Sequence, residues 1–427
     1  MIMNNLSQAD DSPRPLRLAL FSGNYNYTLD GANKSLNRLV THLQRTLGAE
    51  VRVYSPTTLT PAFAPAGELI SVPSFAIPTR PDYRVALGIT PGVRRDLLAF
   101  KPDLIHLSAP DLLGSAALKL ARSLDVPIVA SVHTLFDTYL DYYALGWLSG
   151  FVRNRLWAFY RGCDYVMAPT NAIADELRIN ALPARVRIWA RGVDPDLFNQ
   201  QRRSAAWRAQ HGLKTDLPVV VFMGRIVMEK GLAVFADAVR RFEHKHGPLQ
   251  VLVIGEGPAR EAFEDMLPNA IFTGFLSAEA LATALASGDI FFNPSSTETF
   301  GNVNLEAMAS GLAMVCSDAP NTRALLRDGE SAILCAPTDG AKFCEAIASL
   351  IDDPALLTKM QTAAFKRSVD YRWPEILDAV VDVYKEALAS RPEVRGLDST
   401  TAPDAINMTA LPSSRDIEAV RSVMLAP

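Results

Sequence analysis

The chain has 427 residues, of which 49% are hydrophobic and 21% are charged, and its net charge is −4. This composition is typical of an ordinary globular protein of two or three domains, and the charge gives no support to nucleic-acid binding. The charge is unevenly spread, with +3 over residues 1–200 and −7 over the remainder. The first half is therefore the better candidate for meeting an anionic surface or acceptor.

Cysteine usage and the amino terminus indicate the compartment. The four cysteines show no metal-ligand spacing, which favours a reducing environment over a disulfide framework. Residues 1–15 are polar and have no apolar signal core, and no apolar run approaches the roughly 18 residues of a membrane span. We therefore expect a cytoplasmic protein with a disordered terminus at 1–15.

Short apolar segments alternate with helical patterns in two series along the chain. Such alternation predicts parallel sheets covered on both faces, so two series predict two doubly wound α/β domains. The first series is Leu16–Phe21, Glu50–Tyr54, Leu104–Leu107, Ile128–Val132 and Tyr165–Ala168. The second is Val219–Phe222, Gln250–Ile254, Ile271–Thr273, Ile290–Asn293 and Ala313–Cys316.

The polar stretch after Phe198 separates the two series. We expect an N-terminal domain at 16–199 and a C-terminal domain at 200–370, with a helix near 371–390 that completes the first domain. The segment 391–427 is rich in Ser, Thr, Pro and Asp, which predicts a mobile tail.

The second series opens with a strand that ends at Gly224, and Arg225 and Lys230 follow on the loop to the next helix. Two fixed cations there can neutralise a diphosphate, and they act where charge develops if the diphosphate leaves. Taken alone, the pattern fits a surface Arg and Lys beside a turn equally well.

Two further turns lie at the same predicted edge of the second sheet. Gly255 and Gly257 follow one strand, and Thr273 to Phe275 end the next. Glycine lets the backbone approach a ligand closely, although a lone Gly-x-Gly is a weak signal. The convergence of several such turns at one sheet edge carries more weight than any of them alone.

Two carboxylates, Glu298 and Glu306, bracket a Phe300-Gly301-Asn302 turn that links a buried strand to a helix rich in small residues. Ligands bind outside the carboxyl ends of parallel strands, and helix starts attract polar oxygens. Ionised carboxylates there can accept hydrogen bonds from a polyhydroxylated ligand. For the pair alone, a helix cap and a solvated helix residue are the better explanation of the pattern.

In order and spacing these motifs resemble family 4 of the glycosyltransferases (the group 1 type), over roughly residues 16–390. The segments Lys101–His106, Ser131–Thr134 and Ala190–Phe198 resemble the family's first-domain strand ends and interdomain segment. The resemblance implies the GT-B fold, in which two Rossmann-like domains face each other across a cleft. It implies retention of configuration, no metal and no cofactor, with a nucleotide-diphosphate sugar as co-substrate.

The resemblance also implies roles for individual residues. Arg225 and Lys230 would bind the donor diphosphate, Glu298 a hydroxyl of the donor sugar and Glu306 the ribose, while His133 would lie over the sugar. His133, Arg225, Lys230 and Glu298 are therefore the catalytic candidates. The implied donor-binding residues are Gly31, Gly224, Arg225, Lys230, Gly255, Gly257, Thr273, Phe275, Glu298, Phe300, Gly301, Asn302 and Glu306.

The resemblance implies a mechanism in which no side chain of the enzyme is established as the nucleophile. The acceptor hydroxyl attacks the face that the diphosphate leaves, and the leaving phosphate takes its proton. Glu298 is better explained as orienting the sugar than as attacking it. A histidine at a strand end is commonly structural, which remains an alternative for His133.

Residues 139–161 contain eight aromatic residues interleaved with Arg153, Arg155 and Arg161. Such a stretch can lie at a membrane interface, and it can equally pack its aromatic side chains into the first domain. Together with the resemblance, it suggests a membrane-associated acceptor and a peripheral position on the inner face of the cytoplasmic membrane.

We therefore expect transfer of a hexose from GDP-mannose or a UDP-sugar, such as UDP-glucose or UDP-glucuronate, to a membrane lipid or lipid-linked glycan. A soluble or polysaccharide acceptor is an alternative. A nucleotide-sugar epimerase of the same fold and a binding protein without catalysis are the competing classes. An oxidoreductase is poorly supported, because no Gly-x-Gly-x-x-Gly follows the first strand.

Overall fold

A computed structural model of the chain describes residues 14–28, 31–77, 80–133, 146–180, 185–214, 216–298 and 300–390. The chain forms two compact units. One contains the described parts of 1–131, 155–166 and 381–427, and the other those of 132–154 and 167–380. The predicted tail at 391–427, and all but the last two residues of the terminus at 1–15, lie outside the described residues.

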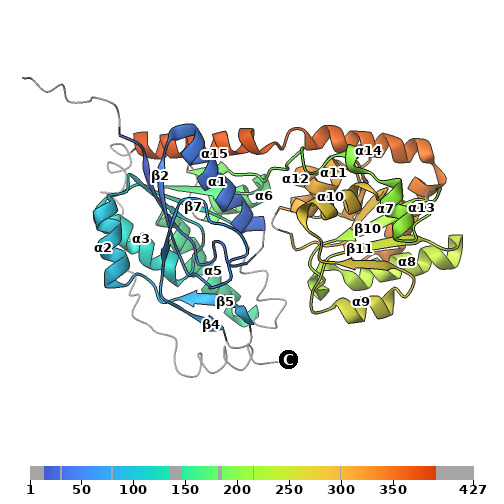
Figure 1. Ribbon diagram of the computed structural model, residues 1–427, viewed down its shortest axis with the longest axis horizontal. Coiled ribbons are helices and arrows are strands. Elements are labelled where there is room, and N and C mark those ends of the chain that lie inside the picture. Colours follow the sequence, from blue (N-terminus) through green and yellow to red (C-terminus); the bar gives the residue numbers. More distant parts are fainter. Residues whose placement is uncertain are drawn as a thin grey trace, which may run out of the picture. The chain divides into compact units, whose positions relative to one another are not determined.

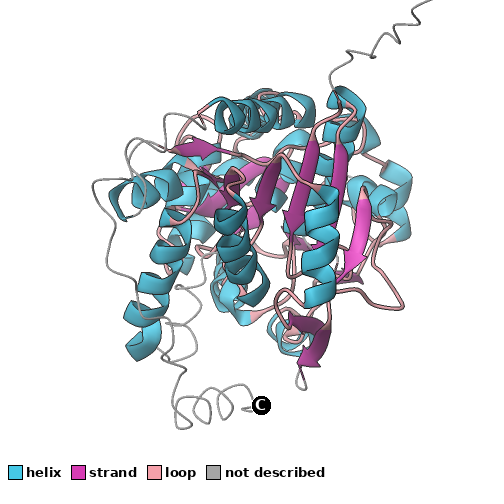
Figure 2. Cartoon of the chain, turned by 90° about the vertical axis from the view of Figure 1, so that its left-hand side faces the viewer, coloured by secondary structure: helices cyan, strands magenta, loops and turns pink. Residues whose placement is uncertain are grey.

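The first sheet has seven strands in the order β3-β2-β1-β6-β7-β8-β9, and helices flank its strands (Figure 2). Its pairs from β3 through β2, β1 and β6 to β7 are parallel. A separate antiparallel pair joins β4 and β5. The strands are β1 (Arg17–Phe21), β2 (Glu50–Ser55), β3 (Glu68–Ser71), β4 (Ser74–Ile77), β5 (Arg80–Ala86), β6 (Leu104–Leu107), β7 (Ile128–Ser131), β8 (Tyr165–Ala168) and β9 (Val186–Ile188).

The second sheet has six strands, all paired in parallel, in the order β12-β11-β10-β13-β14-β15. The order reverses between β10 and β13, which is where open parallel sheets bind their ligands. The strands are β10 (Val219–Met223), β11 (Gln250–Ile254), β12 (Ile271–Gly274), β13 (Ile290–Asn293), β14 (Ala313–Ser317) and β15 (Ile333–Cys335).

Helices connect the strands of both sheets. In the first part of the chain they are α1 (Gly31–Leu47), α2 (Pro91–Phe100), α3 (Leu112–Leu124), α5 (Gly146–Arg161) and α6 (Asn171–Asn180). The later helices are η1 (Gln200–Arg202), α7 (Ala205–Gln210), η2 (Met228–Lys230), α8 (Leu232–His246), α9 (Arg260–Met266), α10 (Ala278–Ala286), α11 (Asn302–Ala309), α12 (Pro320–Leu325), α13 (Gly340–Asp352), α14 (Pro354–Ser368) and α15 (Trp373–Ala389).

Alternating side chains of β10 build two cores, one on each face of the second sheet. Val220 and Phe222 pack with α8, α9 and α13, whereas Val221 and Met223 pack with α10 and α11. The helices α8 and α9 lie on one side of β10 and β11, and α10 and α11 lie on the other (Figure 1). Both faces are thus buried, so polar side chains can gather only at the sheet's edges and ends.

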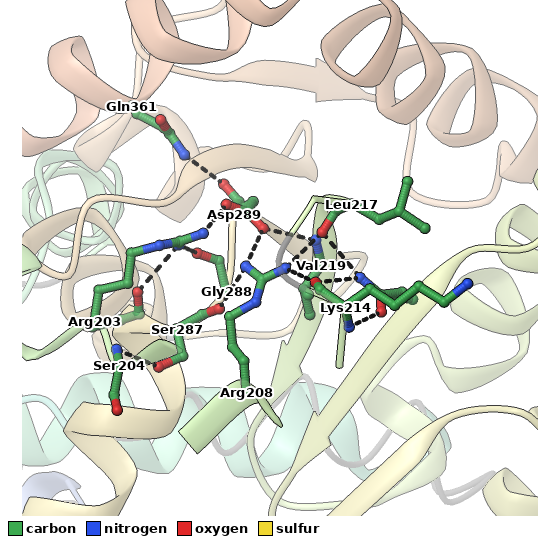
Figure 3. Close-up of polar contacts among 12 residues, drawn as sticks. Arg203, Ser204, Arg208, Lys214, Leu217, Val219, Ser287, Gly288, Asp289 and Gln361 are labelled. Carbon is green, nitrogen blue, oxygen red and sulfur yellow. Dashed lines mark hydrogen bonds and ion pairs between the residues drawn. The ribbon is translucent and has the colours of Figure 1, made fainter. Parts of the chain in front are cut away.

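An ion-pair network around Asp289 lies at the amino end of this sheet, with Arg208 buried and Arg203 partly exposed (Figure 3). Arg208 donates to Asp289 Oδ2 at 3.1 Å, and Arg203 donates to Oδ1 at 2.7 Å. The backbone N–H of Val219 also donates to Oδ2, at 2.8 Å. This network ties α7 and the first residue of β10 to the start of β13, at the opposite end from the strand-end loops.

The sequence-based strands match the observed ones to within one residue at each end, and the doubly wound α/β class is confirmed. Five strands were not predicted from the sequence: β3, β4, β5, β9 and β15. Three of these lie at sheet edges and two form the separate pair, and most have few buried residues. Such strands lack the continuous apolar run that marks a central parallel strand.

Candidate functional site

The loop after β10 carries the two predicted cations. Arg225 is exposed, whereas Lys230 ends η2 and is partly buried. Gly231 follows with a φ of 75°, and a Cβ there would lie 3.1 Å from the carbonyl oxygen of Pro294. Glycine therefore allows the loop after β10 to pack against the end of β13.

Lys230 and Glu298 meet at the point where the strand order reverses. Lys230 Nζ lies 2.5 Å from Glu298 Oε1, and the two side chains are 23% and 18% exposed. A charge-assisted bond of this length holds both groups in place. The structure thus brings together two predicted catalytic residues that are 68 positions apart.

The loops after β10 and β11 are hydrogen-bonded to each other. Ile226 N donates to Glu256 O at 2.9 Å, and Gly224 N donates to Ile254 O at 3.0 Å. A Cβ on Gly255 would overlap the carbonyl oxygen of Gly224, and the φ of Gly255 is 140°. Only glycine fits there, so the Gly-x-Gly turn serves first to bring two strand-end loops into contact.

The end of β12 continues this row of loops. Gly255 N donates to Gly274 O at 3.1 Å. Thr273 donates its hydroxyl to Val253 O at 3.4 Å, so its side chain is engaged by the sheet. Phe275 is 68% exposed, which leaves an aromatic ring open at the same edge.

The turn before α11 contains a buried aromatic side chain, and buried polar side chains lie next to it. Phe300 is 5% exposed and its ring lies 6.2 Å from that of Tyr371, while Gly301 precedes the helix. Asn304 is fully buried and accepts from Asn293 Nδ2 at 2.7 Å. Within the described part of the chain, the buried Asn302 Oδ1 and Asn304 Nδ2 have no hydrogen-bond partner.

Glu306 lies half-buried in the second turn of α11. Its neighbours Leu305 and Ala307 are buried in the core, which fixes the face of the helix that Glu306 occupies. Gly31 opens α1 in the other unit, and its part in donor binding stays a prediction. Among the described residues, no three His, Cys, Asp or Glu side chains gather as a metal site would require.

His133 contacts a residue to which sequence reasoning gave no role. Its Nδ1 lies 2.7 Å from Nη2 of Arg191, and its ring meets that of Trp189 edge-on at 5.3 Å. Arg191 is only 4% exposed, and burial lowers its pKa to about 10. The sequence contained one sign that Arg191 is buried, because this charged residue directly follows the apolar Trp189 and Ala190.

The stretch at 139–161 is described only from residue 146 onward. Phe159 and Tyr160 of α5 are buried, as the packing alternative predicts for these two residues. Arg153, Arg155 and Arg161 are exposed. No described helix combines the length and apolar character that a membrane crossing requires.

Comparison with known families covers both halves of the chain. Residues 29–197 match the family described as Glycosyltransferase Family 4, and residues 217–353 match Glycosyl transferases group 1. A GDP-mannose-dependent alpha-mannosyltransferase of Mycolicibacterium smegmatis is 32% identical over 88% of this chain and 99% of its own. Sulfoquinovosyl transferase SQD2 of Arabidopsis thaliana is 30% identical over 84% of this chain and 71% of its own.

Solved structures share the fold at lower identity. Sucrose-phosphate synthase from Thermosynechococcus elongatus superposes with a TM-score of 0.73 at 20% identity, covering 88% of this chain and all of that one. WaaG, a glycosyltransferase involved in lipopolysaccharide biosynthesis, superposes with a TM-score of 0.63 at 18% identity, covering 86% and 99%. These likenesses confirm the predicted GT-B fold.

Proposed function

Because this chain belongs to family 4 of the glycosyltransferases, we propose that it is a retaining hexosyltransferase that uses a nucleotide-diphosphate sugar. The observation that carries the proposal is the contact between Lys230 and Glu298. It joins one residue suited to a diphosphate and one suited to a sugar hydroxyl, at the reversal point of the second sheet.

The roles of the donor-site residues follow from their chemistry and place. Arg225 and Lys230 would neutralise the diphosphate, and the backbone amides of Phe300, Gly301 and Asn302 would assist at the start of α11. Glu306 would accept hydrogen bonds from the ribose, one helical turn beyond this site. The row of loops at Gly224, Gly255, Gly257 and Thr273 would border the nucleobase, with the exposed ring of Phe275 available for stacking.

In this mechanism the acceptor hydroxyl attacks the face of the sugar from which the diphosphate departs. The leaving phosphate takes the proton, while Arg225 and Lys230 stabilise the negative charge that develops on it. Glu298 orients the sugar, because a carboxylate engaged by an ammonium group at 2.5 Å is a poor nucleophile. The two cations supply the charge that a metal would otherwise provide, so we expect turnover to survive EDTA.

The relatives guide the choice of donor and acceptor. The mannosyltransferase relatives are named for GDP-mannose, and SQD2 is named for sulfoquinovose transfer. We propose GDP-mannose or a UDP-sugar such as UDP-glucose or UDP-glucuronate as donor, and a membrane lipid or lipid-linked glycan as acceptor. The exposed arginines of α5 support a peripheral contact with the anionic inner face of the cytoplasmic membrane.

A donor panel tests the proposal directly. Purified protein is incubated with GDP-mannose, UDP-glucose or UDP-glucuronate and a membrane-lipid extract, with and without EDTA, and products are identified by mass spectrometry. The anomeric configuration follows from NMR coupling constants, and retention is the expected result. Inversion, a strict metal requirement, or conversion of the nucleotide sugar to an epimer without release of nucleotide would each contradict it.

A further inference from the structure

Arg191 is a buried cation whose surroundings point to a purpose beyond stability. Its guanidinium donates from Nη2 to His133 Nδ1 at 2.7 Å and from Nη1 to the carbonyl oxygen of Trp189 at 3.0 Å. It also lies 5.1 Å from the centre of the Trp189 ring. His133, Trp189 and Arg191 all belong to the same compact unit, which also contains the predicted donor-binding loops after β10 and β13.

Within the described ranges of the chain, no carboxylate forms an ion pair with Arg191, although its side chain is 4% exposed. Its pKa of about 10 keeps it protonated at neutral pH. Burying an unpaired charge is costly, and the contact with Trp189 offsets only part of that cost. An apolar side chain would fill the same space at less cost, so the charged one needs a functional explanation.

The direction of the hydrogen bond determines the state of the histidine. A guanidinium has five N–H donors and no acceptor, so His133 Nδ1 must accept with its lone pair. The ring is then neutral, and its single proton is on Nε2. The edge-on contact with Trp189 holds the plane of the ring in addition.

We propose that Arg191 is a positioning residue that holds His133 as the neutral tautomer with its proton on Nε2. The imidazole can then donate a hydrogen bond to an oxygen of the donor sugar, and it does not act as a proton acceptor. This inference rests on the proposed function. It agrees with a reaction in which the leaving phosphate, and not the histidine, takes the proton of the acceptor.

The tautomer can be measured without any substrate. The ring nitrogens of the six histidines are observed by 15N NMR, and His133 is assigned by the loss of its signals in His133→Gln. The wild-type protein should show an unprotonated Nδ1 and a protonated Nε2 at neutral pH. Arg191→Met should give a mixture of tautomers, whereas Arg191→Lys, which keeps a donor-only cation, should preserve the wild-type pattern. A wild-type ring with its proton on Nδ1 would overturn the inference.

A double-mutant cycle tests the consequence for turnover. Arg191→Met should lower kcat by about 10- to 100-fold, as expected for losing an aligned donor. In His133→Gln the amide nitrogen takes the place of Nε2–H and needs no tautomer, so adding Arg191→Met should cost little further. Arg185→Met, a half-buried arginine before β9, is the matched control and should leave kcat unchanged.

The outcomes separate this inference from the proposed function. Equal losses from Arg191→Met in the wild-type and His133→Gln backgrounds would show that Arg191 acts independently of the histidine. Unchanged kcat in Arg191→Met would also overturn the inference while leaving glycosyl transfer intact. If no donor supports transfer, the proposed function fails, and the NMR measurement still decides the state of His133.

Discussion

The role that we propose for Lys230 is to stabilise the negative charge that develops on the leaving diphosphate. Lys230→Ala should lower kcat by about 10²–10³-fold with little change in melting temperature, because a partly exposed cation contributes more to the transition state than to folding. Steady-state kinetics and thermal melting measure the two effects. Lys245→Ala, an exposed lysine in the last turn of α8, is the control. Wild-type turnover in Lys230→Ala would rule out the role given to this residue.

Replacing Glu298, the acidic partner of Lys230, should change nucleotide binding and turnover in opposite directions. Glu298 holds Lys230 Nζ at 2.5 Å, and the diphosphate must compete with that carboxylate for the ammonium group. Glu298→Gln should therefore bind GDP or UDP several-fold more tightly while turning over more slowly, because the sugar loses its orienting carboxylate. Isothermal titration calorimetry gives the first quantity and kinetics the second. Weaker nucleotide binding in this variant would show that the pair assists binding.

At the scale of elements, the contact between two strand-end loops depends on one glycine. Gly255→Ala would force a methyl group onto the carbonyl oxygen of Gly224. We expect a loss of roughly 2–4 kcal/mol in the free energy of unfolding, together with a raised KM for the donor.

Gly247 is a matched control that separates the clash with the neighbouring loop from the strain of a positive φ. Gly247 also has a positive φ, of 91°, but a Cβ there meets open space. Gly247→Ala should cost about 1–3 kcal/mol through backbone strain alone and leave KM unchanged. Equal effects of the two substitutions on KM would mean that the loop contact does not shape the site.

The opposite end of the second sheet should affect stability alone. Arg208→Met removes the buried partner of Asp289, leaving Arg203 and the Val219 N–H, so we expect a loss of about 3 kcal/mol. Arg203→Met should cost less, because the Arg203 side chain is 43% exposed. Urea unfolding measures both. The kcat of the folded fraction should not change, and a loss of kcat in Arg208→Met would indicate coupling between the two ends of the sheet.

At the scale of the whole molecule, α15 reaches back to the first sheet. Tyr384 is bonded to His106 Nδ1 at 2.6 Å, across 278 positions of sequence, and Ser131 is bonded to Nε2 at 2.9 Å. Both ring nitrogens of His106 are thus engaged in a site without solvent exposure. The part of α15 from Val381 onward, which includes Tyr384, is therefore packed into the first unit.

Burial of His106 makes stability depend on pH. Desolvation lowers its pKa from 6.5 to about 3, so below about pH 6.5 the unfolded chain binds a proton that the folded protein does not. Stability is therefore full above pH 6.5 and falls as the pH decreases toward 3. Between pH 7.5 and 5.5 this one group should remove about 1.4 kcal/mol. Urea unfolding of wild type and His106→Gln at several pH values should show a steeper decline for wild type, and equal slopes would contradict the assignment.

Local patterns in the sequence predicted the class of fold and most of the loops that lie at the carboxyl edge of the second sheet. Central parallel strands are buried on both faces, so their apolar runs are continuous and can be read locally, as in Val219–Phe222. Cations, carboxylates and glycines directly after such strands must lie at the carboxyl edge of the sheet. Edge strands such as β3 and β15 carry no such local signal.

Which side chains come into contact depends on the packing of the whole chain. The strand order, with β10 beside β13, brings Lys230 to Glu298, and no local pattern encodes the pairing of strands separated by two others in the chain. The same holds for His133 and Arg191, which are 58 positions apart. Local sequence sets the conformation of each element, whereas contacts between distant residues depend on how all the elements pack at once. For this reason the sequence could suggest His133, and only the fold revealed the arginine that orients it.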